Sequence, residues 1–199
     1  NITNEFDILV TKVADSGCSG FLFQSKADFI FGISTSNGYH ITDKPQVIIS
    51  AGSGIGTYLP LIFNHNISSE KYAFLAFRTK KTIPYFDEME KSVEHGKLKL
   101  FIELSREDFS IETYNHRIKM RKTDERYIDK LFEENAELII ELALPISKGG
   151  MEATFHICGN NSFFKTIIDA LGNIDPNIVT DLKNYNRLHT CLLYTSPSP

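Results

Sequence analysis

The chain has 199 residues, 42% of them apolar, and a formal net charge of -4. That is enough apolar sequence to bury a core in one large domain, or in one domain and part of another. Because acidic and basic residues are mixed along the chain, no single-sign field favours nucleic acid or an anionic membrane as a partner. Lys119, Arg121 and Lys122 form one short basic run, which is followed at once by two acidic residues and is interpreted as a solvated loop.

Membrane-spanning and extracellular classes are disfavoured by the sequence. No apolar stretch approaches the roughly 18 residues that cross a bilayer, and the first residues lack the order of a signal peptide. Cys18, Cys158 and Cys191 lie far apart without a C-x-x-C pair, which argues against a disulfide framework and a zinc site. The histidines form no H-x-x-x-H pair, so no metal is predicted. We therefore expect a reducing compartment such as the cytoplasm, and no direct membrane insertion.

The first 44 residues differ from the rest of the chain. Residues 6–13 alternate as a half-buried strand, and no full helix is predicted before Pro45. Residues 1–44 are therefore expected to be the end of a β-domain. Lys44 and Pro45 mark the predicted boundary, because proline cannot donate a hydrogen bond into a central strand.

From Pro45 onward, apolar β-rich runs alternate with helical patterns. Strands are predicted at residues 46–50, 72–76, 98–103 and 154–157, and helices at residues 55–63, 85–94, 126–143, 162–171 and 176–185. This rhythm predicts an α/β domain over residues 45–191, with a Rossmann-like, doubly wound parallel sheet between helices. Ligands of such sheets bind beyond the carboxyl ends of the strands, at the topological switch point. The loop at Gly52 and the turn formed by Cys158, Gly159 and Asn160 are both expected there.

The most informative stretch is residues 45–58, where a buried-strand pattern runs into a glycine-rich loop and then a predicted amphipathic helix. Gly52 and Gly54 have no Cβ, so the backbone can approach a ligand closely, and the N–H groups at the helix start are free to face an anion. The loop therefore favours a nucleotide. Its spacing is not the full G-x-G-x-x-G pattern, and a glycine turn of this kind also serves close packing alone, so both interpretations stay open.

The end of the chain has a different character. Residues 192–199 lack periodicity and contain two prolines, which predicts disorder. The same residues resemble translated sequencing adapter. We therefore treat them as a non-native tail and expect that the native C-terminus has been lost.

Six short motifs follow one another between residues 17 and 160. They are Gly17-Cys18-Ser19 with Phe21 and Leu22, the stretch of residues 45–58, Ala76-Phe-Arg78, Tyr85-Phe-Asp-Glu-Met-Glu90, Leu104-Ser-Arg-Glu107 and Phe155-His-Ile-Cys-Gly159. In this order they resemble the motifs of the ferredoxin-NADP reductase superfamily, especially its diflavin branch of NADPH-cytochrome reductases and sulfite reductase flavoproteins. Any one of them occurs by chance, whereas six in the right order rarely do.

The resemblance implies a flavoprotein oxidoreductase that transfers hydride between a nicotinamide nucleotide and FAD in electron transport. Residues 1–44 would be the C-terminal remnant of an antiparallel FAD-binding β-barrel, followed by the NAD(P)-binding domain. Gly17, Cys18 and Ser19 would contact the FAD pyrophosphate. The nicotinamide nucleotide would be held by Gly52, Ser53, Gly54, Arg78, Ser105, Arg106, Tyr127, Asp129, Gly159 and Asn160, with Cys158 beside the nicotinamide C4 position as the catalytic residue.

The coenzyme is left open between NADPH and NADH. In NADPH-specific members of the family, a lysine and a polar amide flank an aromatic residue near the 2'-phosphate; if that aromatic is Tyr127, these positions hold Glu125 and Asp129. A like charge about 4 Å from the phosphate costs on the order of 4 kcal/mol at an effective dielectric near 20. Such carboxylates can instead accept hydrogen bonds from the ribose of NADH. Alternatively, they are only favoured at a helix N-terminus, and Arg106 dominates.

Parts of the family pattern are missing. The R-x-Y-S segment that cradles the flavin would precede residue 1, so the chain is expected to be a fragment. Residues 187–191 reach the place where the family carries an acidic residue and an aromatic that covers the flavin. The expected electron acceptors are a flavodoxin-like FMN domain, a b-type haem domain or a fumarate-reductase-like domain. The alternatives are a non-catalytic, regulatory nucleotide-binding module derived from such a reductase, and a purely structural α/β domain.

Overall fold

The structure is a computed structural model that describes residues 42–64, 68–107, 113–115, 117–122 and 128–192. The chain divides into two compact units, Asn1–His40 and Ile41–Pro199, and the described residues all belong to the second. The expected barrel remnant, including Gly17, Cys18 and Ser19, thus lies outside the described residues except for its last three positions. No described helix is long and apolar enough to cross a bilayer.

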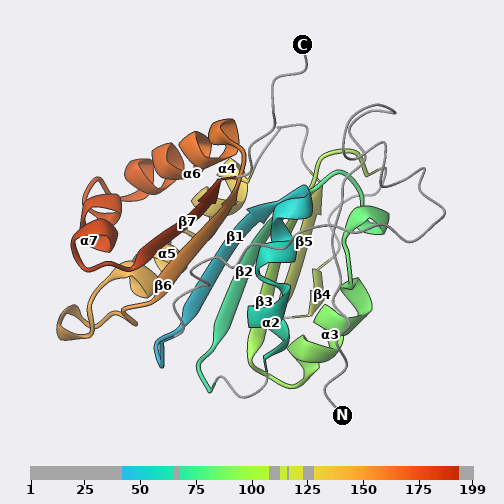
Figure 1. The fold of residues 1–199 in the computed structure, drawn as a ribbon, viewed down its shortest axis with the longest axis horizontal. Helices are drawn as coiled ribbons and strands as arrows, with labels where there is room; N and C mark the ends of the chain where they lie inside the picture. Colours follow the sequence, from blue (N-terminus) through green and yellow to red (C-terminus); the bar gives the residue numbers. More distant parts are fainter. Residues whose placement is uncertain (1–41, 65–67, 108–112, 116, 123–127, 193–199) are drawn as a thin grey trace, which may run out of the picture. The chain divides into compact units, whose positions relative to one another are not determined.

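Within the described residues, the domain is built on a seven-stranded sheet with the order β4-β5-β3-β2-β1-β6-β7 (Figure 1). The strands are β1 (Gln46–Ala51), β2 (Lys71–Phe77), β3 (Leu98–Leu104), β4 (Thr113–Asn115), β5 (Ile118–Lys122), β6 (Thr154–Gly159) and β7 (Leu188–Leu192). Neighbouring strands are parallel except β4 and β5, which are antiparallel. The predicted doubly wound, Rossmann-like α/β fold is confirmed.

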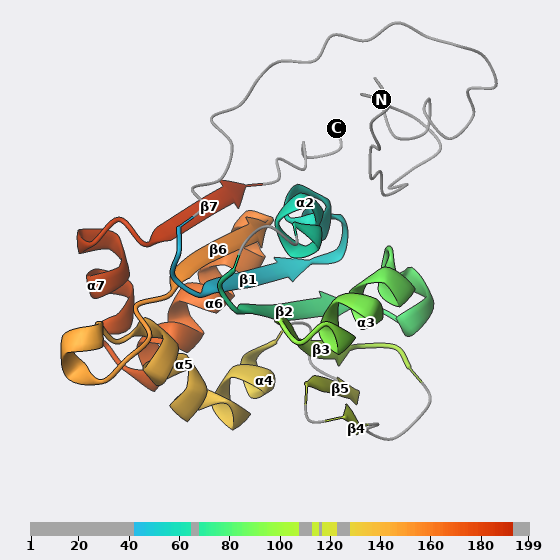
Figure 2. The same cartoon turned by 90° about the horizontal axis from the view of Figure 1, so that it is seen from below.

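Helices cover both faces of the sheet (Figure 2). The α-helices are α2 (Leu59–Phe63), α3 (Phe86–Glu94), α4 (Asp129–Glu134), α5 (Ala136–Ala143), α6 (Asn161–Ile174) and α7 (Ile178–Asn184), and the 3-10 helices are η1 (Gly52–Thr57), η2 (Lys80–Thr82) and η3 (Ile146–Lys148). In Figure 2, α2 lies on one side of the sheet, and α4, α5 and α6 lie on the other. Because both faces are covered, central strands such as β1 are buried at nearly every position.

A hydrophobic core cluster lies between the sheet and helices α4 to α7. At its centre, Phe74 of β2 stacks on Phe101 of β3 with ring centroids 4.5 Å apart, and Phe132 of α4 meets Phe74 edge-on at 5.2 Å. These three rings hold α4 against the middle of the sheet.

A buried arginine joins three elements on the same side. Arg187, directly before β7, donates from Nη1 to the Ala153 carbonyl (3.1 Å) and from Nη2 to the Ala143 carbonyl (2.9 Å). Burial lowers the pKa of Arg187, and the nearby Glu152 and Asp181 oppose that change. The guanidinium therefore fixes the end of α5 and the start of β6 relative to β7.

Several sequence predictions differ from the structure. The basic run was interpreted as a loop, but residues 118–122 form strand β5 beside β3. The prediction missed the alternation in which Ile118 and Met120 are buried while Lys119 is exposed. Strand β7 was not predicted, and its last residue, Leu192, belongs to the segment expected to be a disordered tail; residues 193–199 lie outside the described part of the chain.

The helix predicted over residues 126–143 is broken at Asn135 into α4 and α5. The Asn135 side chain donates to the Leu131 carbonyl (2.6 Å) and accepts a hydrogen bond from Lys119 Nζ (3.1 Å). Asparagine side chains compete in this way with the helical hydrogen-bond pattern. The hydrophobic periodicity of the sequence alone does not reveal such a break in a helix.

Candidate functional site

Four turns lie at one edge of the sheet, because β3, β2, β1 and β6 are adjacent and parallel. From β1 the chain winds outward through β2 to β3, and it later returns to the other side of β1 as β6. The switch point is therefore between β1 and β6. The structure places the Gly52 loop and the turn at residues 158–160 on either side of this point, where sheets of this type bind ligands.

Gly52 and Gly54, the first two glycines of the loop after β1, have different structural roles. Gly52 has φ +55°, and a Cβ added there would meet nothing within 4 Å, so its outer side is open. A Cβ at Gly54 would lie 2.8 Å from the Cys158 carbonyl oxygen and 2.8 Å from Ser50 Oγ. Gly54 is thus required for the loop to pack against β6, whereas Gly52 leaves the loop accessible. The packing interpretation of the loop therefore applies to Gly54. The nucleotide interpretation stays a prediction, and Gly52 is the residue that is compatible with it.

The segment after Gly52 differs from the amphipathic helix predicted over residues 55–63. Residues 52–57 form η1, and α2 follows with only five residues. Ala51, which precedes η1, provides no side-chain cap. Ser53 lies half-buried in this tight turn. Backbone N–H groups, rather than a long helix, are what this loop offers to an anion.

Cys158 lies at the end of β6, fully buried, in register with Ser50 of β1 and Cys191 of β7. Its Sγ is 3.5 Å from Thr57 Oγ1. The pKa of the Cys158 thiol is raised to about 12, mainly by burial; the hydrogen bond with Thr57 opposes this rise, and the neighbouring Cys191 adds to it. Cys158 is therefore a neutral thiol at physiological pH and unsuited to act as a thiolate nucleophile.

The turns after β2 and β3 bring three predicted site residues together. The Arg106 N–H donates to the Arg78 carbonyl (2.7 Å), and the Ser105 N–H donates to the Phe77 carbonyl (3.0 Å). Arg78 and Arg106 are both exposed. The Lys80 N–H also donates to Glu107 Oε2 (2.8 Å), which ties the two turns to each other. Two guanidinium groups are thereby available at the same edge as the Gly52 loop.

The domain is similar in fold, and not in sequence, to proteins of known structure. No family model matches the chain, and no curated protein matches it in sequence. Ferredoxin-NADP+ reductase from Plasmodium falciparum superposes with a TM-score of 0.60 at 17% identity over 88% of this chain and 66% of that one. The same enzyme with 2'P-AMP gives 0.58 at 16% identity, over 88% and 65%. The domain has the ferredoxin-NADP+ reductase fold.

A second group of solved structures shares the fold. The flavohem-like FAD/NAD-binding domain of nitric oxide dioxygenase from Vibrio cholerae O1 biovar El Tor superposes with a TM-score of 0.58 at 16% identity, over 90% of this chain and 65% of that one. The chain spans less than two thirds of each of these proteins. The resemblance seen in the six motifs is thus confirmed at the level of the fold, which this domain shares with ferredoxin-NADP+ reductase.

Within this reductase fold, Gly159 and Asn160 have clear structural roles. A Cβ at Gly159 would lie 2.3 Å from Cδ1 of the Phe163 ring. Asn160 is the N-cap of α6, and its Oδ1 accepts a hydrogen bond from the Phe163 N–H at 2.8 Å. A ligand contact by Asn160 would therefore involve its main chain in preference to the capping oxygen.

Asp129 and Tyr127 are the remaining residues predicted for the site. Asp129 begins α4 and lines a cavity of about 550 Å³ together with residues of α6 such as Thr166 and Asp169. Tyr127 lies outside the described residues. Among the residues that the structure describes, no group of three or more His, Cys, Asp or Glu side chains could hold a metal ion.

Sequence reasoning missed Thr57 and Tyr58. Thr57 Oγ1 lies within 3.5 Å of Cys158 Sγ and 3.9 Å of Cys191 Sγ, and the Tyr58 ring lies 5.5 Å from that of His156. Burial, followed by the neighbouring Cys158 and Cys191, raises the pKa of Tyr58. The available signal was their position directly after a glycine-rich loop at a switch point.

The neutral state of Cys158 gives a direct prediction. At pH 8, iodoacetamide should modify Cys158 at least about tenfold more slowly in the folded protein than in the urea-unfolded chain, because the thiolate is the reactive form. Mass spectrometry of the peptide that contains Cys158 measures both rates. Since its folded pKa is raised above the unfolded value of 9.0, the stability that the thiol contributes is present below pH 9 and is lost toward pH 12. Equal rates in the two states would contradict this description.

Proposed function

We propose that this domain binds the nicotinamide nucleotide of a flavin-dependent NAD(P)H oxidoreductase at the switch-point edge. The observation that carries the proposal is the convergence of four turns there: an open loop at Gly52, the guanidinium groups of Arg78 and Arg106, and the buried thiol of Cys158. The shared fold of ferredoxin-NADP+ reductase and of the FAD/NAD-binding domain of nitric oxide dioxygenase supports the same assignment.

Each group has a distinct part in the proposed site. The open side of Gly52 lets a pyrophosphate approach the backbone, as an added side chain there would not. Arg78, Ser105 and Arg106 offer charged and hydroxyl donors to phosphate and ribose. Cys158 presents an uncharged, polarizable surface beside the position assigned to the nicotinamide. The bound cofactors would supply the hydride chemistry, while these residues orient the nucleotide and exclude water.

NADPH is the coenzyme that the described residues favour. Arg106 is exposed, and the neighbouring Glu107 already accepts a hydrogen bond from the Lys80 N–H. Of the two carboxylates expected to oppose a 2'-phosphate, Asp129 has its Oδ1 buried at the start of α4, and Glu125 lies outside the described residues. The P. falciparum reductase named above was solved with 2'P-AMP, a nucleotide of the same chemical type. Arg106 is thus the residue proposed to distinguish NADPH from NADH.

The FAD, and the FMN, haem or fumarate-reductase-like acceptor, remain expectations of the resemblance. The residues expected to contact FAD lie outside the described part of the chain. Electron transfer from FAD to a partner domain or protein is therefore proposed on the resemblance alone.

Replacing Arg106 with alanine tests the nucleotide site. We expect the affinity for NADPH to fall about 10- to 100-fold, because a hydrogen bond to a charged group contributes about 1.5–3 kcal/mol. The affinity for NADH should change by less than about threefold, since NADH lacks the 2'-phosphate. Isothermal titration calorimetry at one salt concentration measures both coenzymes.

Lys148→Ala is the matched control, since it removes an exposed cation from η3 instead. Equal losses for NADH and NADPH in the Arg106 variant would show that Arg106 does not contact the 2'-phosphate. Failure of the unmodified chain to bind either coenzyme would favour the purely structural alternative. Binding without hydride transfer, in a preparation loaded with FAD, would favour the regulatory module.

A further inference from the structure

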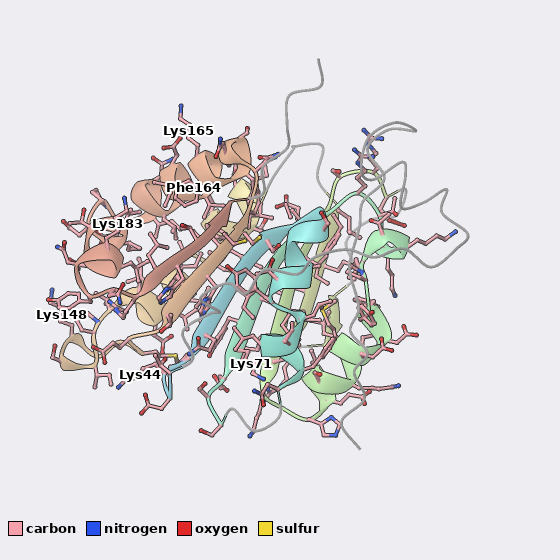
Figure 3. The ribbon with its side chains drawn as sticks, in the orientation of Figure 1. Lys44, Lys71, Lys148, Phe164, Lys165 and Lys183 are labelled. Carbon is pink, nitrogen blue, oxygen red and sulfur yellow. The ribbon has the colours of Figure 1, made fainter. Side chains whose placement is uncertain are left out.

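A cavity of about 260 Å³ lies where β2 and β3 begin, at the edge of the sheet opposite the proposed nucleotide site. It is lined by Ile62, Lys71, Ser92, His95, Lys97 and Leu98. Figure 3 labels Lys71 at this end of the sheet, beside α2. Among the described residues of this lining, the basic ones are accompanied by no acidic one.

Lys71 is a buried cation. Its residue surface is only 2% exposed, and Nζ donates to the carbonyl oxygens of Ile62 (3.1 Å) and Asn64 (2.7 Å) at the end of α2. An ammonium has three N–H donors, so these two acceptors leave one for a further partner. Among the described residues, no carboxylate forms an ion pair with Lys71. A buried charge without a counter-charge is costly, and an anion would remove that cost.

The carboxylate of Glu70, the residue before Lys71, interacts with other side chains. Glu70 accepts a hydrogen bond from the Tyr72 hydroxyl and forms an ion pair with Lys99 at 3.7 Å. Successive side chains of a strand point to opposite faces, so Tyr72 joins the core beneath α4 to α7 while Lys71 points toward α2. Glu70 therefore does not compensate the charge of Lys71.

A second cation adjoins the first. Lys97 directly precedes β3, and its carbonyl accepts a hydrogen bond from the Lys71 N–H at 2.8 Å. Burial, and then the charge of Lys97, lower the pKa of Lys71. The Lys97 side chain is exposed and can turn toward a ligand. Ile62 and Leu98, both buried, give the same cavity an apolar wall.

We propose that this cavity binds a small organic anion, with its carboxylate or phosphate oxygens against Lys71 and Lys97 and a short apolar body against Ile62 and Leu98. At about 30 Å³ for a water-sized group, the cavity has room for about nine such groups. That volume accommodates a short carboxylic acid or a small phosphate ester but not a dinucleotide. The site is therefore separate from the proposed nucleotide site, and its ligand is of a different class.

The experiment is a titration of the full chain with inorganic phosphate and, separately, with butyrate, followed by two-dimensional amide NMR with chloride at matched ionic strength as the reference. We expect saturable shifts at residues 62–64 and 92–98. A response to phosphate alone would assign a phosphate ligand, and a response to butyrate alone would assign an aliphatic carboxylate. Absence of saturable shifts at these residues with both anions would overturn the proposal.

Substitutions of single lysines test whether anion binding depends on this cavity or on cationic residues elsewhere. Lys71→Met should abolish binding, but it also removes the donor to the end of α2, so Lys97→Gln is the deciding change. We expect Lys97→Gln to weaken binding at least about tenfold. Lys148 is an exposed lysine on a different part of the domain (Figure 3), and Lys148→Gln should leave the affinity unchanged. Equal affinity in Lys97→Gln, or shifts confined to the residues around Gly52 and Arg106, would refute the site.

Discussion

Replacing Phe74 with alanine is expected to lower the free energy of unfolding by about 3–5 kcal/mol. Phe74 is completely buried, stacks on Phe101 at 4.5 Å and meets Phe132 at 5.2 Å, so its removal opens a cavity between β2, β3 and α4. Domains are stable by only about 5–15 kcal/mol, which makes this a large fraction of the total. Urea unfolding followed by circular dichroism measures the change.

Two controls define the cause of that loss. Phe74→Leu retains most of the buried volume and should cost clearly less than the alanine variant. Ile146→Ala removes an apolar side chain that is 56% exposed, and it should change stability by no more than about 0.5 kcal/mol. If Phe74→Ala and Ile146→Ala gave similar unfolding midpoints, the central position of the Phe74 ring would be wrong.

Gly54→Ala is expected to destabilise the fold by about 1–3 kcal/mol, the usual cost of inserting a methyl group into a filled space. The new Cβ would lie 2.8 Å from the Cys158 carbonyl oxygen, a backbone atom that no rotamer change can move away. The loop must therefore lift from β6, and NADPH affinity should fall along with stability. Urea unfolding and calorimetric titration with NADPH measure the two effects.

Gly172→Ala is the matched control for that substitution. Gly172 lies within α6, and a Cβ there meets nothing within 4 Å. Alanine should therefore stabilise the helix by up to about 1 kcal/mol and leave NADPH binding unchanged. An unfolding midpoint for Gly54→Ala as high as that for Gly172→Ala would contradict the close approach of the loop to β6.

The sequence predicts the centre of the sheet better than its edges. Strands β1, β2, β3 and β6 are buried on both faces, so each is rich in apolar residues and bounded by turns. Strand β5 mixes buried Ile118 and Met120 with charged residues, which makes it resemble a loop until its pairing with β3 is known. The break at Asn135 likewise depends on Lys119, a residue from another element.

In the candidate site, too, some features can be predicted from the sequence and others depend on contacts between distant elements. The meeting of the turns that carry Arg78 and Arg106 follows from the parallel order of β2 and β3, which βαβ rhythm alone predicts. The contacts that require Gly54 and Gly159 depend on the Cys158 carbonyl and the Phe163 ring, whose places are known only after folding. The burial of Lys71 is the feature that the sequence predicts least well, because a lysine before an apolar run is typical of a solvated strand end.

The position of Arg187 matters for anyone who shortens this domain. A version that stops before residue 187 loses more than an edge strand, because the guanidinium that links the Ala143 and Ala153 carbonyls goes with it. Those two carbonyls belong to the end of α5 and the approach to β6, which carries Cys158. A shortened version that is meant to keep these links should therefore extend through Arg187, whose own carbonyl also accepts a hydrogen bond from the Phe155 N–H of β6.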